Sequence, residues 1–167
     1  MAGIYLHIPF CKQKCNYCDF YKEVSQHATD QFTGALVSEL RLRAAYLNSA
    51  SVRTIYFGGG TPSVVRYDQF QTIFDTLHSE FNIDPSAEIT LEANPDDLNP
   101  AYLAMLRKLP FNRLSIGIQS FDDKELRSVN RRHTAQQAIQ AVHDAREAGF
   151  SNLSIDLIYG LPGQTMD

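Results

Sequence analysis

Short runs of β-branched and aromatic residues alternate with longer helical patterns along almost the whole chain. The runs are typical of strands and lie at residues 3–8, 53–57, 88–93, 113–118 and 152–159. Between them, apolar residues recur at helical spacing. Strands that alternate with helices are joined by right-handed crossovers, which makes the resulting sheet parallel. The sequence therefore predicts an α/β fold, either doubly wound or curled into a barrel.

Four helices are predicted, and capping signals mark where three of them begin. Thr29 and Thr134 are expected N-caps, and Asn99 followed by Pro100 is a favourable start for a third helix. Gly149 is expected to end the last helix. The expected apolar faces are Phe32, Leu36, Leu40 and Leu47 in the first helix, Phe70, Ile73, Phe74, Leu77 and Phe81 in the second, and Ala138, Ile139, Val142 and Ala145 in the last.

Glycines and unusual polar residues lie at or near the carboxyl end of every predicted strand. They are the cysteine-containing segment after the first strand, "GGGTP" after the second, Glu92 and Asn94 at the end of the third, Gln119 after the fourth and Asp156 in the fifth. In a parallel barrel these strand ends form one rim, where active sites are built. We therefore expect a partial (β/α) barrel. Five strands cannot close such a barrel, so residues 1–167 are expected to form one domain at the amino-terminal end of a longer protein.

Composition and charge limit which partners the protein can bind and where in the cell it can be located. Hydrophobic residues make up 44% of the 167 residues, which is enough for one substantial core. The net charge of -4 provides no basic field, which argues against nucleic acid and anionic lipid as partners. The first residues lack a signal-peptide pattern, and no apolar stretch is long enough to span a bilayer. We therefore expect a cytoplasmic protein without stable membrane insertion.

All three cysteines lie in one short segment, "HIPFCKQKCNYCDFY", as Cys11, Cys15 and Cys18. A reducing cytoplasm and an odd number of cysteines both argue against a disulfide. The spacing would also place the three thiols on one face of a buried helix. However, Pro9 precedes the segment and four polar residues lie inside it, which favours a loop that wraps around a ligand.

Two kinds of metal site fit three clustered thiols. A zinc site would need a fourth ligand, for which His7 and His27 are candidates, but neither has the close paired spacing of structural zinc sites. One compact loop with three thiolates suits an iron-sulfur cluster better. Because a four-iron cluster normally takes four cysteines, three would leave one iron open to a substrate or cofactor.

The segment "YLHIPFCKQKCNYC" resembles the C-x3-C-x2-C signature of radical S-adenosylmethionine enzymes. The similarity is strongest to the branch that contains oxygen-independent coproporphyrinogen III oxidase and the heme chaperone HemW. Further motifs of that branch follow in the same order along nearly the whole chain: "IYFGGGTPS", "ITLEANPDDL", "RLSIGIQSF", "NRRH" and "SIDLIYGLPGQ". The resemblance implies a [4Fe-4S] cluster on Cys11, Cys15 and Cys18, with S-adenosylmethionine chelating the fourth iron.

The resemblance also implies a set of S-adenosylmethionine contacts. They are Tyr5, Tyr17, Gly58, Gly59, Gly60, Thr61, Glu92, Gln119, Arg131 and Asp156. Several of these residues also suit an ordinary structural role: the glycines a tight turn, Arg131 a solvated cation, and Asp156 a strand-end hydrogen bond. Glu92 suits such a role less well, because an unpaired carboxylate in an apolar strand is costly to bury. His7 and His133 are expected to pack or to form hydrogen bonds rather than to act as ligands.

Two functions are compatible with this branch. One is a heme-binding chaperone that delivers heme to acceptors such as respiratory enzymes. The other is an oxidoreductase that decarboxylates coproporphyrinogen III, so catalysis itself is left open. A reducible cluster also implies a partner that acts as its electron donor. The decarboxylase carries a further cysteine just after the signature, whereas "DFYKEV" follows Cys18 here, which favours the chaperone with heme as cargo.

Overall fold

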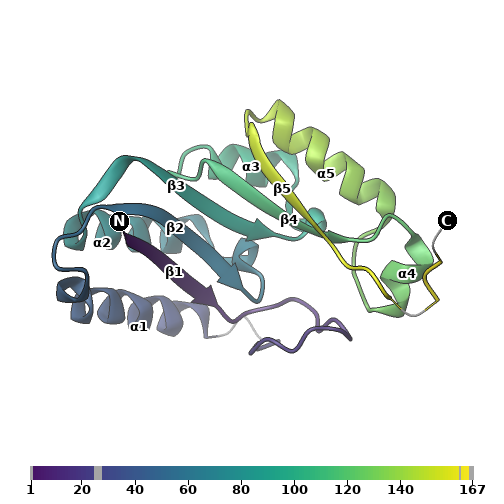
Figure 1. The fold of residues 1–167 in the computed structure, drawn as a ribbon, viewed down its shortest axis with the longest axis horizontal. Helices are drawn as coiled ribbons and strands as arrows, with labels where there is room; N and C mark the ends of the chain where they lie inside the picture. Colours follow the sequence, from purple (N-terminus) through teal and green to yellow (C-terminus); the bar gives the residue numbers. More distant parts are fainter. Residues whose placement is uncertain (1, 25–27, 162, 166–167) are drawn as a thin grey trace.

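The five predicted strands form one parallel sheet in the computed structural model of the chain (Figure 1). The structure describes residues 2–24, 28–161 and 163–165. The strands are β1 (Ala2–Ile8), β2 (Val52–Gly59), β3 (Ile83–Ala93), β4 (Arg113–Gln119) and β5 (Asn152–Leu157). Each strand pairs in parallel with the next, so the order across the sheet is β1-β2-β3-β4-β5. This order has no reversal, unlike that of a doubly wound sheet, and it confirms the partial barrel.

Helices connect the strands. They are α1 (Thr29–Leu42), α2 (Tyr67–Glu80), α3 (Pro100–Leu106), α4 (Asp123–Ser128) and α5 (Ala135–Glu147), with short 3-10 turns η1 (Ala44–Leu47), η2 (Pro62–Val64) and η3 (Pro95–Asp97). Four of the helices pack along the sheet, whereas α4 lies beyond the carboxyl end of β4 (Figure 1). In the described part of the chain, none of these helices has the length and apolar character needed to cross a membrane.

The hydrophobic core lies between the sheet and the helices and contains a cluster of four phenylalanines. The ring of Phe57 in β2 lies 5.7 Å from Phe70, 5.4 Å from Phe74 and 5.2 Å from Phe111, measured between centroids. All four side chains are buried. The apolar face predicted for α2 is therefore confirmed, and it fixes β2 against the helical layer.

The capping predictions are confirmed at two helices and wrong at one. The side chains of Asn99 and Thr134 accept hydrogen bonds from backbone N–H groups in the first turns of α3 and α5. At α1 the helix already includes Thr29, and Ala28 occupies the N-cap position without a side-chain hydrogen bond. Because alanine has no acceptor, α1 depends on the packing of its apolar face. The chain also leaves α1 before the expected end at Leu47 and forms η1.

Two features of the carboxyl-terminal half differ from the sequence pattern. Helix α4 was not predicted, because only Leu126 is buried in its six residues and no apolar periodicity marks it. Its start is fixed by the side chain of Asp122, which accepts hydrogen bonds from two N–H groups. In α5, Ile139 is 43% exposed, because the small residues Ala138 and Ala141 face the core instead.

Candidate functional site

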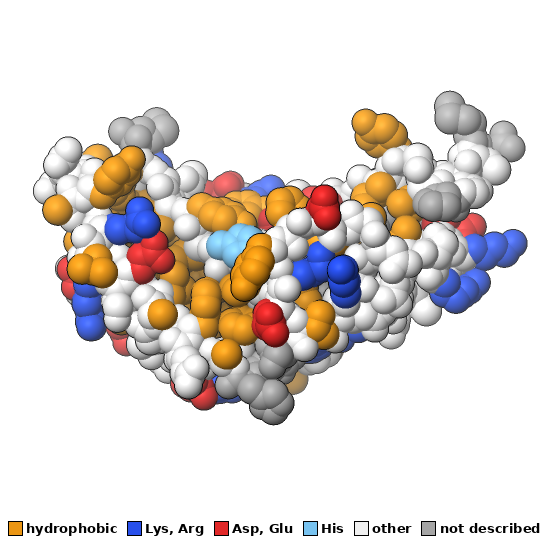
Figure 2. All heavy atoms as spheres, turned by 90° about the horizontal axis from the view of Figure 1, so that it is seen from below, with side chains coloured by type: hydrophobic (Ala, Val, Ile, Leu, Met, Phe, Trp, Pro, Cys, Tyr) orange, Lys and Arg blue, Asp and Glu red, His pale blue; other side chains and the backbone are white. Residues whose placement is uncertain are grey.

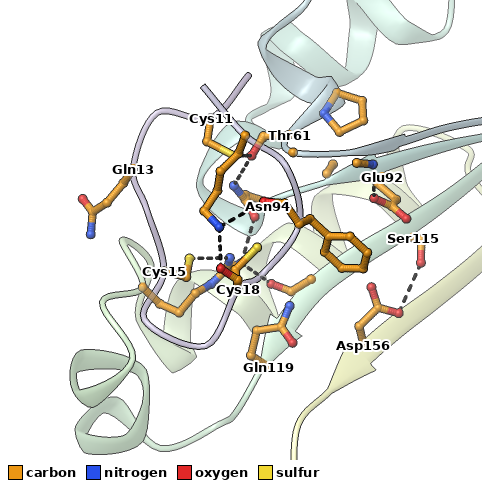
Figure 3. A pocket seen from close by; sticks show the side chains of 18 of the residues that line it. Cys11, Gln13, Cys15, Cys18, Thr61, Glu92, Asn94, Ser115, Gln119 and Asp156 are labelled. Carbon is orange, nitrogen blue, oxygen red and sulfur yellow. Dashed lines mark hydrogen bonds between the residues drawn. The ribbon is translucent and has the colours of Figure 1, made fainter. Parts of the chain in front are cut away.

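A cavity of about 200 Å³ lies at the carboxyl ends of the strands, beside the cysteine-containing loop (Figure 3). Most residues predicted for the site line it, namely Cys11, Cys15, Tyr17, Cys18, Gly59, Gly60, Thr61, Glu92, Gln119, Arg131 and Asp156. Two others, Tyr5 and Gly58, are not part of this lining. Residues from distant parts of the sequence therefore meet at one rim, as the strand-end pattern predicts.

Alternation along the strands separates the cavity from the core. In β3, Glu92 lines the cavity while the preceding Leu91 is fully buried in the core. In β4, Ser115 lines the cavity between Leu114 and Ile116, which are both fully buried. The sheet thus has an outer apolar face and an inner face with polar side chains.

The cysteine segment is a loop, so the alternative of a buried helical stripe is wrong. All three thiols are free; Cys11 is buried and the other two are half-buried. Backbone hydrogen bonds attach the loop at both ends, from Cys11 N–H to Glu23 O at 3.0 Å and from Asn16 N–H to Val129 O at 3.0 Å. The second bond ties the loop to the residue that follows α4.

The arrangement of the thiols fits a cluster better than a single ion. In the part of the chain that the structure describes, no three His, Cys, Asp or Glu side chains converge closely enough to hold one metal ion. His7 faces a different groove, and His27 lies outside the described residues. The three sulfurs instead lie around one end of a common cavity (Figure 3), which leaves room for several irons.

Electrostatics around the thiols depend on nearby cations. Burial raises the pKa of the Cys11 thiol, while a hydrogen bond from Thr61 Oγ1 to its sulfur at 3.5 Å acts in the opposite direction. A metal ligand must be a thiolate, so positive charge has to offset this burial. Lys22 supplies part of it, with its Nζ 2.5 Å from the carbonyl oxygen of Cys18.

Arg131 joins three parts of the site. Its Nη1 donates to Cys15 Sγ at 3.5 Å and to Tyr17 Oη at 3.4 Å, and its Nη2 donates to Asn94 Oδ1 at 2.8 Å. A second bond from Nη2 reaches Gly117 O at 2.5 Å. The alternative of a freely solvated surface cation is therefore wrong. Because hydrogen bonds to cluster sulfurs tune an iron-sulfur centre, this placement suits a site with bound iron.

Glu92 is a half-buried carboxylate that forms no ion pair within the described part of the chain. Its Oε1 accepts a hydrogen bond from Tyr56 Oη at 2.7 Å, and its Oε2 accepts one from Gly59 N–H at 3.2 Å. Burial raises the pKa of Glu92, and burial together with Glu92 raises the pKa of Tyr56 to about 12. Across the described residues no Lys, Arg or His forms an ion pair with Glu92. The cavity therefore favours a cation at this position.

The three consecutive glycines are required by neighbouring protein atoms. A Cβ on Gly60 would lie 2.8 Å from Phe10 O and 2.9 Å from Ile8 O. Gly59 has φ +112°, and a Cβ there would lie 2.7 Å from the ring of His7. These contacts hold β2 against the start of the cysteine loop, in agreement with the alternative of a tight turn. Contact with a cofactor stays a prediction for Gly58, Gly59 and Gly60.

Tyr5 lies beside the cavity rather than in it. Its ring packs on Tyr56 with centroids 6.0 Å apart, and its hydroxyl lies 3.3 Å from Nδ1 of His7. Tyr5 and His7 line an apolar groove of about 530 Å³ between β1 and α1, and hydrophobic side chains gather on the face seen in Figure 2. His133 is buried, with Nε2 3.0 Å from Ile118 O. The hydrogen-bonding roles expected for His7 and His133 are therefore confirmed.

Strand-end contacts also involve the last two predicted residues. Ser115 Oγ lies 3.4 Å from Asp156 Oδ1, which supports the strand-end hydrogen bond considered for Asp156. Gln119 has φ +71°, and the register between β4 and β5 shifts next to it. A non-glycine residue in this region is uncommon and is often found at a functional site.

Several cavity residues were not predicted as contacts. They are Gln13, Phe20, Lys22, Pro62, Ala93, Asn94, Ser115 and Gly117. Asn94 carried a usable signal, since it is polar at the end of a strand. The inner-face residues Ser115 and Gly117 could have been found from the alternation in "RLSIGI", because a parallel strand packed on both faces is normally apolar throughout.

Known proteins that are similar to this chain over nearly its whole length belong to the branch that the sequence motifs indicate. The family model for the radical SAM superfamily matches residues 5–167. The heme chaperone HemW of Mycobacterium tuberculosis is 38% identical over 99% of this chain and 43% of its own length. Oxygen-independent coproporphyrinogen III oxidase of Salmonella typhimurium is 38% identical over 98% of this chain and 36% of its own length.

A solved structure agrees with these relatives. Coproporphyrinogen III oxidase (HemN) from Escherichia coli, a radical SAM enzyme, superposes with a TM-score of 0.89 at 38% identity. The match covers 98% of this chain and 38% of that one, so the chain spans about two fifths of the length of the relatives it matches. The chain belongs to the radical SAM superfamily, and HemW and HemN are among its relatives.

Proposed function

We propose that the chain binds a [4Fe-4S] cluster through Cys11, Cys15 and Cys18 and S-adenosylmethionine in the adjoining cavity. When bound, this pair supplies one-electron chemistry, with a separate protein as electron donor. The chain's own groups hold the parts in place: Arg131 donates to Cys15, and Glu92 offers an unpaired carboxylate to a cation. S-adenosylmethionine carries two such cations, a sulfonium and an ammonium. Tyr5, Tyr17, Gly58, Gly59, Gly60, Thr61, Gln119 and Asp156 complete the proposed contacts.

We further propose that the whole protein is a cytoplasmic heme chaperone that carries heme to acceptor proteins such as respiratory enzymes. The observation that carries this choice is the absence of a cysteine in "DFYKEV" after Cys18. Phe20, in this segment, lines the cavity with an apolar ring that offers no sulfur to a metal or a substrate. Sequence identity does not discriminate, because both kinds of relative are 38% identical to this chain.

The alternative is oxygen-independent coproporphyrinogen III oxidase, an oxidoreductase of porphyrin biosynthesis. It is favoured by the superposition with the oxidase structure. That superposition covers the shared barrel, which both functions would use.

The metal site is tested first on this chain. Anaerobic reconstitution should give about four irons and four sulfides per chain, and Cys15→Ala should abolish the cluster. Stoichiometric zinc in anaerobically isolated protein, with no iron after reconstitution, would refute the site.

The choice of function is tested on the longer protein that contains this chain. It should pass heme to an apo-acceptor and leave coproporphyrinogen III unchanged in the presence of S-adenosylmethionine and a reductant. Formation of protoporphyrinogen IX with release of carbon dioxide would overturn this choice. Heme binding alone does not decide it, since an apolar porphyrin adheres to many hydrophobic surfaces.

A further inference from the structure

One buried carboxylate binds three segments that surround the cavity. Asp97, in η3, is 5% exposed. Its Oδ1 accepts a hydrogen bond from Lys12 Nζ at 2.6 Å and another from Arg132 Nη2 at 3.2 Å, and its Oδ2 accepts one from Ser63 Oγ at 2.7 Å. Asp97 itself does not line the cavity. It therefore acts on the site only through its partners.

Each partner of Asp97 lies next to a cavity residue. Lys12 follows Cys11 in the cysteine loop, and Ser63 lies two residues after Thr61. Arg132 follows Arg131, whose guanidinium donates to Cys15. The network thus connects the cysteine loop, the turn after β2 and the segment before α5.

The cysteine loop depends on polar contacts for its order. Between residues 11 and 18, only Cys11 is buried, so the loop gains little from hydrophobic packing. Lys12 reaches across 85 positions of sequence to Asp97, and this is its one ion pair in the described part of the chain. A second carboxylate, Asp96, lies 2.5 Å from Arg132 and can hold that residue without Asp97. Among the described residues no second carboxylate lies within ion-pair distance of Lys12.

We propose that Asp97 is a positioning residue, which fastens the cysteine loop through Lys12 and holds the Arg131 segment against Cys15 through Arg132. Its effect on a bound cluster rests on the proposed function. The fastening itself is a property of the chain alone and can be measured without iron.

The first experiment measures access to Cys11 in the metal-free chain. Iodoacetamide labelling is followed by mass spectrometry, with Lys12→Met as the test and Lys14→Met as the matched control. Lys14 is exposed in the same loop and its ammonium has no partner in the described structure. We expect Cys11 in Lys12→Met to react about tenfold faster than in the chain without substitutions, because local opening exposes it. Lys14→Met should react at the unchanged rate.

Asp97→Asn should accelerate labelling further, because it weakens all three contacts at once. Since it also removes the charge that pairs with Lys12 and Arg132, the melting temperature of each variant is measured by circular dichroism. Lys12→Met removes a half-exposed side chain and should keep a cooperative transition, so it decides the proposal even if Asp97→Asn fails to fold. Equal labelling rates in Lys12→Met and Lys14→Met would overturn the proposal.

The second experiment repeats the comparison after cluster reconstitution. Iron transfer to a chelator should be several-fold faster in Lys12→Met than in Lys14→Met. The electron paramagnetic resonance spectrum of the reduced cluster should change in Asp97→Asn, because the cysteine loop loses its attachment through Lys12 and Arg132 keeps only its ion pair with Asp96. A chain that takes up no cluster but labels as expected would refute the proposed function and retain the fastening role. Normal cluster uptake, with equal labelling and equal iron loss in Lys12→Met and Lys14→Met, would refute the fastening role and retain the proposed function.

Discussion

The two faces of the same sheet follow different rules. On the outer face, Phe57, Leu91 and Ile116 are fully buried under the helices. On the inner face, the neighbouring positions carry polar side chains such as Glu92 and Ser115, which line the cavity. A parallel sheet covered on both sides is normally apolar on both. The outer face therefore supplies stability, whereas the inner face carries the polar groups that we propose as ligand contacts.

The largest effect should come from the outer face. Phe57→Ala should lower the free energy of unfolding by about 3 to 5 kcal/mol, because it opens a void among four packed aromatic rings. The comparison variant is Tyr56→Phe on the inner face, which removes the hydroxyl that donates to Glu92 and should cost about 1 kcal/mol or less. Urea unfolding of both variants makes the measurement. Similar losses would contradict the division between the faces.

The next effect concerns His133, which is buried beneath the rim. Burial, together with Arg131, lowers the pKa of His133 to about 4, while the hydrogen bond to the backbone carbonyl of Ile118 acts in the opposite direction. The unfolded chain therefore takes up a proton near pH 6.5 that the folded chain rejects. The contribution of neutral His133 to the free energy of unfolding is fully present above pH 6.5. It should fall by about 2 kcal/mol as the pH drops to 4.

The pH dependence is measured by urea unfolding between pH 7 and pH 4, with His133→Gln as the control. Glutamine can still donate to the carbonyl of Ile118, which His133 approaches at 3.0 Å. The variant should lose less stability over this range. An identical slope for both proteins would show that other groups cause the acid sensitivity.

Periodicity and motifs predicted the strand order and most of the cavity lining, because both depend on residues that are close together in the sequence. The strand ends carry their polar residues within a few positions, so one rim could be expected before any contact was known. Contacts between distant loops left no such pattern. Lys12 and Asp97 are 85 positions apart, and neither is unusual in its own segment.

The glycines illustrate a different limit of sequence reasoning. The sequence leaves two reasons for "GGGTP", contact with a ligand or a tight turn, and a Cβ on Gly60 would meet the backbone of Ile8 and Phe10. A glycine indicates that another group approaches the backbone closely, but the sequence alone does not show whether that group is a ligand or another part of the chain. Likewise, α4 has too few buried residues to produce a helical pattern, although Asp122 caps it.

A smaller effect should come from the cap of α5, which belongs to neither face. Thr134→Ala should lower the free energy of unfolding by about 1 kcal/mol, because the side chain satisfies a free N–H group at the helix start. Thr134→Ser keeps the acceptor and should restore most of the loss. Urea unfolding of the two variants is the measurement, and an alanine variant as stable as the serine variant would show that the cap contributes nothing.

The smallest change in stability should come from Glu92→Gln, and its sign is informative. Because burial raises the pKa of Glu92, the folded chain disfavours the charged form, so this stability cost appears as the pH rises and vanishes at low pH. Glutamine can still pair with both neighbours, because its amide oxygen can accept from Gly59 N–H while its amide NH2 donates to the Tyr56 hydroxyl oxygen. The metal-free variant should therefore be as stable as the original chain at pH 4 and equal or slightly more stable at pH 7.

Binding should change in the opposite direction. In cluster-loaded protein, calorimetry should show about tenfold weaker binding of S-adenosylmethionine to Glu92→Gln, since a cation loses its charged partner. Glu88→Gln, on the same strand, loses only an exposed ion pair with Arg113 at 3.9 Å, so it should change stability little and binding not at all. If Glu92→Gln is less stable at pH 7 and its affinity is unchanged, Glu92 has a structural role like that of the outer-face residues. If Glu92→Gln is instead equally or more stable at pH 7 but binds S-adenosylmethionine more weakly, the charge of Glu92 serves the ligand. The ligand-free protein then keeps this unpaired carboxylate at a cost in its own stability.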